Sequence, residues 1–381
     1  MDFALSADQR LVQEMVREFA QKELKPMAAT IDQTQQVPWD SLTTMAKLGL
    51  LGMIVPEEYG GGGMDFVSLA VAIEEISRVC ASTGVITAVN NSLVAYPILT
   101  FGNEAQKRTY LPLLCSGQKV GAFALTEPVA GSDVAGMQSS ARRDGGHYVL
   151  NGAKRFITNG GEAGVYVVFA YTDPGQRHKG ISAFIVERGY PGFTVGKHEE
   201  TMGIRATANC ELVFEDCKVP VENLLGREGE GFKIAMHTLD VSRIDIGAQA
   251  VGLAQGCLDE ALHYSRERRQ FGEPIANFQF IQGMLAQMAT AIEAARLLVY
   301  RAAWLKDSGA KRFSVEASMA KLLASEVAVE CARKAVQIHG GYGYSREFAV
   351  ERLYRDAKVM EIYEGTSQIQ SLVIARGLLG A

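Results

Sequence analysis

A long run of apolar residues at helical spacing is the feature that most constrains the fold of this chain. Between residues 281 and 305, apolar side chains recur every three or four positions and hold one face for about seven turns of helix. A helix with such a face needs other helices to cover it. The sequence therefore predicts that the chain after Gly231 forms a bundle of long helices.

The first third of the chain also has the pattern of helices. Ser6 and Gln9 have the spacing of a capping box, and apolar residues from Leu11 to Phe19 then recur on one face. Apolar, alanine-rich stretches follow around residues 41–51, 66–79 and 92–101. We expect this part of the chain to be all α-helical.

Between these helical parts the period of the sequence changes. Asn151-Gly152 separates two short apolar runs, Tyr148–Leu150 and Phe156–Thr158, and this pair of residues favours a type I′ hairpin turn. Four further runs resemble strands, and glycine, proline and aspartate clusters separate them: 165–171, 180–186, 193–195 and 211–214. The pattern predicts a small β domain that ends near Pro220.

The expected fold is thus an α+β multidomain protein. Residues 1–119 would form an N-terminal all-α domain, residues 120–225 a middle β-barrel or sandwich, and residues 226–381 a C-terminal four-helix bundle. Strands and helices do not alternate, and no G-x-G-x-x-G follows a strand, so the pattern does not support a Rossmann dinucleotide site.

Composition excludes several classes of function. The chain has 48% apolar and 21% charged residues and a formal charge of −5 without a basic run, which argues against nucleic-acid binding. It lacks a signal-peptide pattern and a stretch of about 18 consecutive apolar residues, so we expect a protein without a membrane span. The six cysteines are scattered and the six histidines lack metal-ligand spacing, which predicts reduced thiols and no metal site.

Two glycine-rich segments are candidates for ligand binding. Residues 124–136 bring hydroxyls and backbone donors to the end of a strand, as a planar heterocycle or a phosphate requires, although an ordinary glycine–serine loop would have the same composition. Residues 337–344 place three glycines after a helical run, where the backbone can approach a ligand closely. An ordinary helix C-cap would explain this second pattern equally well, and His339 alone is typical of a structural histidine.

A third segment, residues 362–370, contains an acidic residue next to a helix start. Thr366 or Ser367 can cap the following helix, so Glu364 would lie near the positive end of that helix, which favours the carboxylate anion. The alternative is a solvated loop carboxylate, because the chain has 43 acidic residues and position alone does not single this one out.

Together these segments resemble the acyl-CoA dehydrogenase family over nearly the whole chain. The likeness rests on Thr126-Glu127 followed by Gly131-Ser132-Asp133, on the pattern from Gln337 to Asp356, and on the triplet Glu364-Gly365-Thr366. The resemblance implies the α–β–α fold described above, one FAD for each chain, and a homotetramer built as a dimer of dimers.

The resemblance also assigns residues to the cofactor. Those that would line or flank the flavin are Phe123, Leu125, Thr126, Gly131, Ser132, Phe156, Ile157 and Thr158. Those that would hold the adenine and pyrophosphate across a subunit interface are Arg268, Phe271, Gln279, Gln337, Gly340 and Gly341, and Thr366 and Gln368 would complete the shell. An arginine suits a phosphate because its charge is permanent and its donors form a fork.

For the chemistry, the resemblance implies that Glu364 is the base that removes the α-proton of an acyl thioester, while the β-hydrogen leaves as hydride. Ser132, Asp240, Arg243 and Gly365 would bind the substrate. Some relatives carry the base on the helix that contains Ser242, and a serine there leaves Glu364 without a competitor. Electrons would pass to electron-transfer flavoprotein, in the cytoplasm or the mitochondrial matrix.

The acyl group is the less determined part of this prediction. Residues 83–93 resemble short-chain members of the family, and Gly84 stands where glutaryl-CoA dehydrogenases carry an arginine, which disfavours a dicarboxylate. A branched or cyclic short acyl group stays open, since a pocket discriminates a methylene by only about 1–3 kcal/mol. A non-oxidative acyl-CoA lyase on the same fold, or a helical scaffold without a cofactor, are the alternatives.

Overall fold

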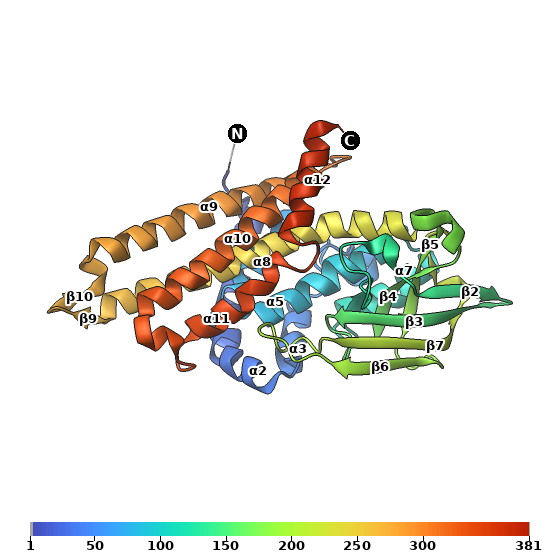
Figure 1. Cartoon of the computed structure of the whole chain (residues 1–381), viewed down its shortest axis with the longest axis horizontal. Coiled ribbons are helices and arrows are strands. Elements are labelled where there is room, and N and C mark those ends of the chain that lie inside the picture. The colour runs from blue at the N-terminus through green and yellow to red at the C-terminus, as the bar shows by residue number, and fades with distance from the viewer. Residues whose placement is uncertain (1–2, 381) are drawn as a thin grey trace.

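A computed structural model describes residues 3–380, and Figure 1 shows its course from N-terminal helices through a β-sheet to a bundle of long helices. The N-terminal helices are α1 (Ala7–Phe19), α2 (Ala28–Thr34), α3 (Trp39–Lys47), α4 (Phe66–Ser77), α5 (Ala81–Ala88), α6 (Tyr96–Phe101) and α7 (Glu104–Cys115). Helix α1 begins at the predicted capping box, in which Ser6 accepts from the Gln9 backbone N–H and the Gln9 side chain accepts from the Ser6 backbone N–H.

The middle part of the chain forms an eight-stranded sheet in the order β6-β7-β3-β2-β4-β5-β8, with β1 parallel to β4. Its strands are β1 (Gly121–Ala124), β2 (Ser140–Asp144), β3 (His147–Ile157), β4 (Val165–Tyr171), β5 (Ile181–Glu187), β6 (Phe193–His198), β7 (Cys210–Pro220) and β8 (Leu224–Leu225). The four strand-like runs predicted after Thr158 correspond to β4, β5, β6 and β7.

The hairpin predicted at Asn151-Gly152 is wrong, because β3 runs through both residues without turning. The pairing of β3 with β7 shifts register between Leu150 and Gly152, so this position is a bulge. The Asn151 side chain exchanges two hydrogen bonds with Asp216 on β7. Glycine is needed because a Cβ at Gly152 would lie 2.4 Å from the Ser139 hydroxyl oxygen.

Strand β4 connects two hydrophobic cores, and its side chains alternate between them. Val165, Val167 and Phe169 join the large core that runs through the helices, whereas Tyr166 and Val168 join a smaller core inside the sheet. Successive side chains of a strand point to opposite faces, so a strand buried on both faces is apolar throughout. The sheet is thereby packed directly against the helical part of the molecule.

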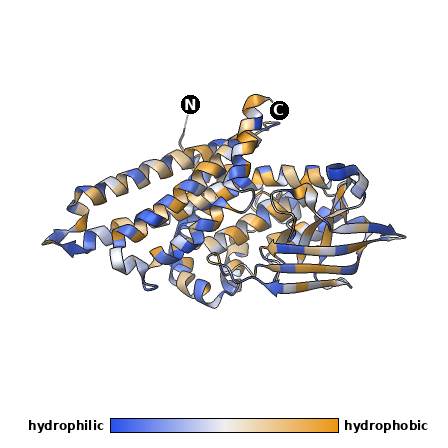
Figure 2. Cartoon of the chain, viewed as in Figure 1, coloured by the Kyte–Doolittle hydropathy of each residue, from blue (hydrophilic) through white to orange (hydrophobic). Residues whose placement is uncertain are grey.

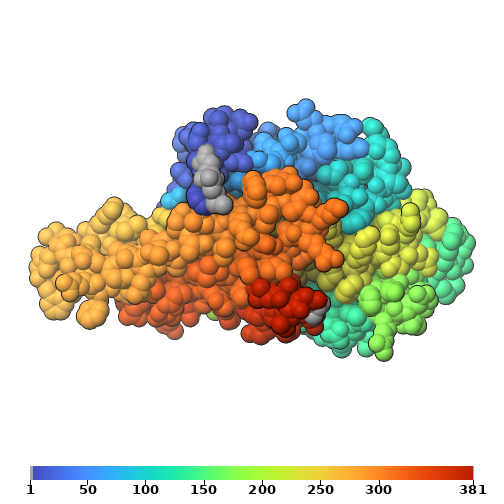
Figure 3. Space-filling model, turned by 90° about the horizontal axis from the view of Figure 1, so that it is seen from above, coloured from blue at the N-terminus to red at the C-terminus, as the bar shows by residue number. Residues whose placement is uncertain are grey.

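The C-terminal part contains the predicted long helices. Its elements are α8 (Gly231–Glu267), β9 (Arg269–Gln270), β10 (Glu273–Pro274), α9 (Gln279–Asp307), α10 (Ser314–His339), α11 (Ala349–Ala357) and α12 (Ser367–Leu379). Hydrophobic and hydrophilic residues are interspersed along α9 and α10 (Figure 2), as expected of helices with one face in a bundle. The end of α8, the β9–β10 hairpin and the start of α9 form an arm that projects from the molecule (Figures 1 and 3).

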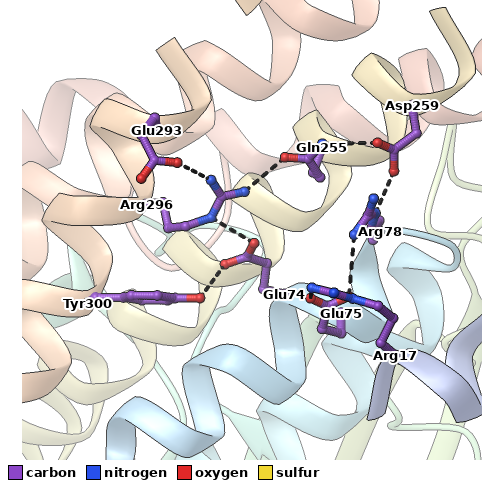
Figure 4. Close-up of polar contacts among 9 residues, drawn as sticks. All are labelled: Arg17, Glu74, Glu75, Arg78, Gln255, Asp259, Glu293, Arg296 and Tyr300. Atoms are coloured by element: carbon purple, nitrogen blue, oxygen red, sulfur yellow. Dashed lines mark hydrogen bonds and ion pairs between the residues drawn. The ribbon is translucent and has the colours of Figure 1, made fainter. Parts of the chain in front are cut away.

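A buried network of charged and polar side chains ties α4 to its neighbouring helices (Figure 4). Glu74 accepts hydrogen bonds from Arg296 at 2.9 Å and from Tyr300 at 2.8 Å, both on α9. Its neighbour Glu75 is bound by Arg17 of α1 at 2.6 Å. The network also includes Arg78, Gln255, Asp259 and Glu293. It fixes α8, which carries part of the candidate site, against the N-terminal helices.

One helical segment meets the length and mean hydropathy of a membrane span, although it is not a run of 18 consecutive apolar residues. Ala81–Phe101 is long and apolar enough by length and composition, but 83% of its most apolar window is buried inside the protein. It comprises α5, a π-helical turn (Val89–Ala95) and α6. The burial is that of a core helix. All six cysteines are likewise buried, and none of them forms a disulfide.

Candidate active site

The loop before α12 holds Glu364 in an unusual backbone conformation. Glu364 and Gly365 both have positive φ angles, 52° and 95°. For a residue with a side chain this conformation costs of the order of 1 kcal/mol and needs support from its surroundings. Gln370 supplies it by donating from Nε2 to the carbonyls of Glu364 at 3.1 Å and Gly365 at 2.9 Å, and Lys321 Nζ donates to the Gly365 carbonyl at 2.8 Å.

This loop is closed at its C-terminal side by the predicted cap of α12. Thr366 accepts on its side-chain oxygen from the backbone N–H of Ile369 at 3.3 Å. The next residue, Ser367, has a buried hydroxyl oxygen without a hydrogen-bond partner among residues 3–380. Gln368 is exposed beside it. The cap therefore presents an unsatisfied polar atom at the position where the cofactor shell was predicted.

The Glu364 carboxylate is aimed into the protein, toward α8 and α10. The hydroxyl of Ser242, on α8, donates a hydrogen bond to it, and the cations of Lys321 and Arg243 act on it electrostatically. Burial raises the pKa of Glu364 to about 7, and these three partners oppose the rise without cancelling it. A carboxyl group with a pKa near neutrality can both accept and release a proton at that pH.

Whatever the start of α12 contributes to the Glu364 anion, the net pKa of this carboxyl is raised by burial. Desolvation exceeds all favourable contributions, so the pKa rises instead of falling. The positive end of a helix contributes only about 0.3–1 kcal/mol for an exposed charge. Burial of a carboxylate is a larger effect.

Two of the predicted substrate residues lie one turn from each other on α8. Arg243 is buried and donates to the Asp240 carboxylate at 2.7 Å, which also accepts from the Ser314 hydroxyl. Burial lowers the pKa of Arg243. Its Nε has no hydrogen-bond partner among the described residues. Asp240 thus fixes the guanidinium beside Glu364, and the Nε donor of Arg243 stays unused among these residues.

Two of the segments predicted to line the flavin meet at the ends of β1 and β3. Thr126 follows β1, and its carbonyl accepts from the backbone N–H of Arg155, near the end of β3, at 2.9 Å. Phe156 has a positive φ of 58° and a side chain 57% exposed, with the Arg155 guanidinium 5.3 Å from its ring centroid. The residues predicted for this cluster are Phe123, Leu125, Thr126, Gly131, Ser132, Phe156, Ile157 and Thr158, of which Leu125 packs in the large core and Ile157 in the core inside the sheet. An exposed aromatic ring held in a strained conformation suits stacking on a planar ligand.

A buried ion pair holds the loop that follows β1 in place. Lys154 and Glu127 are both fully or almost fully buried, and their Nζ and Oε1 atoms are 2.7 Å apart. Glu127 also accepts from the backbone N–H groups of Gln138 and Ser139, while Lys154 donates to the Leu125 carbonyl. The loop between residues 125 and 139 is therefore fixed.

The end of β3 is also linked to α11, which precedes the Glu364 loop. The backbone N–H of Asn159 donates to the Thr207 carbonyl at 2.7 Å, and the Thr207 hydroxyl donates to the Ile204 carbonyl at 3.1 Å. The Ile204 N–H in turn donates to Asp356 of α11 at 2.6 Å. The structure thus couples the middle-domain cluster with the C-terminal helices of the same chain.

The residues predicted to bind adenine and pyrophosphate gather elsewhere, at the arm. Arg268 caps α8 with its guanidinium 5.2 Å from the Tyr342 ring centroid, and Phe271 on the β9–β10 turn is 95% exposed. The group consists of Arg268, Phe271, Gln279, Gln337, Gly340 and Gly341. Gly340 has a φ of 60°, and a Cβ at Gly340 or Gly341 would meet nothing within 4 Å. These glycines therefore border open space.

A single chain does not bring the two predicted FAD clusters together. Strands β9 and β10 lie at one end of the molecule and the sheet lies at the other (Figure 1). This separation is compatible with the prediction that the arm reaches a cofactor on a second subunit. Gly84, used above against a dicarboxylate, packs so closely on α4 that a Cβ would lie 2.1 Å from the Ser77 hydroxyl oxygen. Packing between helices therefore accounts for this glycine.

Several site residues were not predicted from the sequence. Lys321 is fully buried on α10, and burial lowers its pKa to about 8 while Glu364 opposes that shift. Tyr363 donates to Gln249 Oε1 at 2.5 Å. A charged residue among small apolar residues of α10 was the available signal for Lys321. Nothing in the sequence showed that Gln249 and Tyr363 would meet, because they are far apart along the chain.

Comparison with protein families accounts for all three parts of the chain. The acyl-CoA dehydrogenase N-terminal domain matches residues 6–118, the middle domain matches residues 122–217, and the C-terminal domain matches residues 229–379. This chain belongs to the acyl-CoA dehydrogenase family. The α–β–α fold expected from the resemblance is thereby confirmed.

Individual relatives agree with this family over their full length. The chain is 52% identical to the short-chain specific acyl-CoA dehydrogenase of Clostridium acetobutylicum, over 98% of this chain and 99% of that protein. Butyryl-CoA dehydrogenase from Megasphaera elsdenii has a TM-score of 0.97 and 47% identity, with both chains fully covered. A structure from work on the electron transferring flavoprotein of Acidaminococcus fermentans and electron bifurcation has a TM-score of 0.98 and 51% identity, again with full coverage.

Proposed function

We propose that this acyl-CoA dehydrogenase removes two hydrogens across the Cα–Cβ bond of a short-chain acyl-CoA, giving the trans-2-enoyl-CoA. The observation that carries the proposal is the partly buried Glu364 carboxyl, which Ser242 orients and whose pKa is raised to about 7. Short-chain relatives at 52% identity and the butyryl-CoA dehydrogenase fold support the substrate class.

The residues present fit an FAD cofactor. The Phe156 ring is exposed for stacking, Thr126, Ser132 and Thr158 would offer hydroxyls to polar ring atoms, and Ser367 offers a hydroxyl that lacks a partner within residues 3–380. Arg268 would provide the fixed positive charge for a pyrophosphate. When bound, FAD supplies the two-electron acceptor for the β-hydrogen.

The chain's own residues supply the proton chemistry and the alignment. Glu364 accepts the α-proton, so the electron pair of the α C–H bond stays on the substrate and forms the new Cα–Cβ double bond. The β-hydrogen leaves as hydride, with the electron pair of the β C–H bond. The nearby cations of Lys321 and Arg243 favour the ionised, proton-accepting form of Glu364. The backbone N–H of Glu364 would donate to the thioester carbonyl and stabilise the negative charge that develops there.

We further propose a homotetramer, a dimer of dimers, and electron transfer to an electron-transfer flavoprotein. The distance of the arm from the sheet and the exposed apolar residues on it, such as Phe271 and Phe280 at 95% and 90% exposure, favour a second copy as partner. The structural relative from electron transferring flavoprotein work supports the electron acceptor. Relatives come from bacteria and from mitochondria, and we propose the cytoplasm or the mitochondrial matrix as the location.

The test is an anaerobic visible spectrum of the holoprotein before and after addition of butyryl-CoA. The wild type should bleach its flavin band, and Glu364→Gln should retain the band because an amide cannot take the proton. Glu361→Gln is the matched control: its carboxylate pairs with Lys358 in the 3₁₀ helix before the Glu364 loop, so this variant should bleach like the wild type. Bleaching of Glu364→Gln at the wild-type rate would overturn the assignment of the base.

A further inference from the structure

Three buried polar side chains follow one face of α8 through the middle of the molecule. Ser242, Asp245 and Gln249 are spaced by three and four residues, which places them in one row along the helix. Each of them is 1% exposed or less. Since burial of polar groups costs free energy unless they are hydrogen-bonded, each member of the row should have a partner.

The first and third members of the row hold the active-site loop. Ser242 donates to the Glu364 carboxylate. Gln249 accepts on Oε1 from the Tyr363 hydroxyl at 2.5 Å and donates from Nε2 to the Ala81 carbonyl at 2.9 Å. The hydrogen bonds to the loop that carries Glu364 thus account for the burial of both polar side chains.

Asp245, the middle member, has among the described residues a hydrogen-bond partner for only one of its two carboxyl oxygens. Its Oδ2 accepts a hydrogen bond from the hydroxyl of Ser92 in the π-helical turn after α5, whereas its Oδ1 has no partner within residues 3–380. Burial raises the pKa of Asp245 well above its usual range; the Ser92 bond opposes this, and the charge of Glu364 adds to it. An unpaired buried oxygen costs about 1–3 kcal/mol, which an apolar side chain would avoid.

The position of Asp245 relates it to the acyl end of a substrate. Asp240, one of the predicted substrate residues, lies toward the start of α8, and Ser242 marks the position of the Glu364 carboxylate. Asp245 comes three residues further along the helix, about 4.5 Å beyond Ser242 at the usual rise per residue. A four-carbon acyl chain whose α-carbon lies at Glu364 spans most of that separation only when it carries a further polar atom, such as a hydroxyl oxygen, on its last carbon.

We propose that Asp245 and Ser92 form a polar floor of the acyl site and select short acyl-CoA thioesters that carry a hydroxyl group at the far end of the acyl chain. This inference rests on the proposed function. A hydroxyl group both donates and accepts, so it can pair with Asp245 Oδ1 in either protonation state of the aspartate.

Acyl chains that end in an alkyl group or a carboxylate pair less well with Asp245. An alkyl end leaves Oδ1 unpaired, and a site built around a buried polar group discriminates strongly against an analogue that lacks the partner. A carboxylate end would meet a second carboxyl group, and Asp245 forms no ion pair within the described part of the chain. The geometry therefore favours a neutral polar end over both.

The experiment compares 4-hydroxybutyryl-CoA with butyryl-CoA as substrates of the holoenzyme. The wild type should prefer the hydroxylated thioester in kcat/KM by tenfold or more, and Asp245→Leu should lose that preference. Asp245→Asn, whose amide also donates and accepts, should retain most of it. Ser77→Ala is the control, because it removes another buried, unpaired hydroxyl, on α4, and should leave the ratio unchanged.

Equilibrium binding gives a readout that does not depend on turnover. In a Glu364→Gln background, calorimetry should show a dissociation constant tenfold or more lower for the hydroxylated thioester, with the difference lost in the double variant Glu364→Gln/Asp245→Leu. Equal affinity and equal kcat/KM for both thioesters would overturn the inference even if Asp245→Leu does not fold, and would leave the proposed function intact. Failure of both thioesters to bleach wild-type flavin would overturn the proposed function instead, while the binding ratio would still decide the role of Asp245.

Discussion

Removal of the Ser242 hydroxyl should shift the pH dependence of catalysis upward. Its hydrogen bond stabilises the ionised form of Glu364, whose pKa is raised by burial to about 7. Hydrogen bonds to charged groups contribute about 1.5–3 kcal/mol, and one pKa unit corresponds to about 1.4 kcal/mol. Because Glu364 keeps some contact with solvent, the lower end of this range applies. Ser242→Ala should therefore raise the pKa of Glu364 by about one unit.

The sign of the effect on rate follows from the role of Glu364 as a base. Only the carboxylate accepts the α-proton, so the rate rises with pH and reaches a plateau above the pKa of Glu364. In Ser242→Ala the rising limb moves to higher pH by about one unit. The variant should be about tenfold slower than the wild type at pH 6 and should approach the wild-type rate at pH 9, a difference of about 1.4 kcal/mol at the lower pH.

Anaerobic rapid mixing of the holoenzyme with butyryl-CoA, followed by flavin bleaching across this pH range, measures the midpoint. Ser325→Ala on α10 is the matched control, since that buried hydroxyl donates to the Leu322 carbonyl at 3.0 Å and should leave the midpoint unchanged. A midpoint in Ser242→Ala equal to that of the wild type would refute the reasoning. A rate that falls with rising pH would also refute it, because the protonated form of the titrating group would then be the active one.

Three further changes test the packing that supports the site. Lys154→Met leaves the Glu127 carboxylate buried without its cation and should destabilise the protein by about 3–5 kcal/mol, seen as a lower Tm. Gly252→Ala would place a Cβ 2.2 Å from the Glu74 carbonyl oxygen, so the variant should lose Tm or fail to fold, and wild-type stability would contradict the close approach of α4 and α8. Gly283→Ala, on α9, meets nothing within 4 Å of its own chain, so in chains dissociated from the proposed tetramer it should raise stability by up to about 1 kcal/mol through helix propensity; a lower Tm of the dissociated chain would contradict this.

Local rules predicted the elements that depend on neighbours in the sequence. The capping box at Ser6 and Gln9, the cap at Thr366 and the long helix α9 all follow from residues within a few positions of one another. Such signals are short-range, so they appear in the sequence before any tertiary contact forms. The same rules failed at Asn151-Gly152, where a bond to β7 and close approach to Ser139 decided the conformation.

The sequence by itself determined the order of helical and β parts, the segments that carry glycines and hydroxyls, and, through family resemblance, Glu364 as the candidate base. Only the tertiary structure decided the environment of that carboxylate. It brings Ser242 and Lys321 from two other helices to Glu364, and burial then outweighs the effect of the adjacent helix start. It also leaves Asp245 Oδ1 buried without a partner in the described part of the chain. Desolvation depends on what surrounds a group in space, and residues more than a hundred positions apart supply those surroundings here.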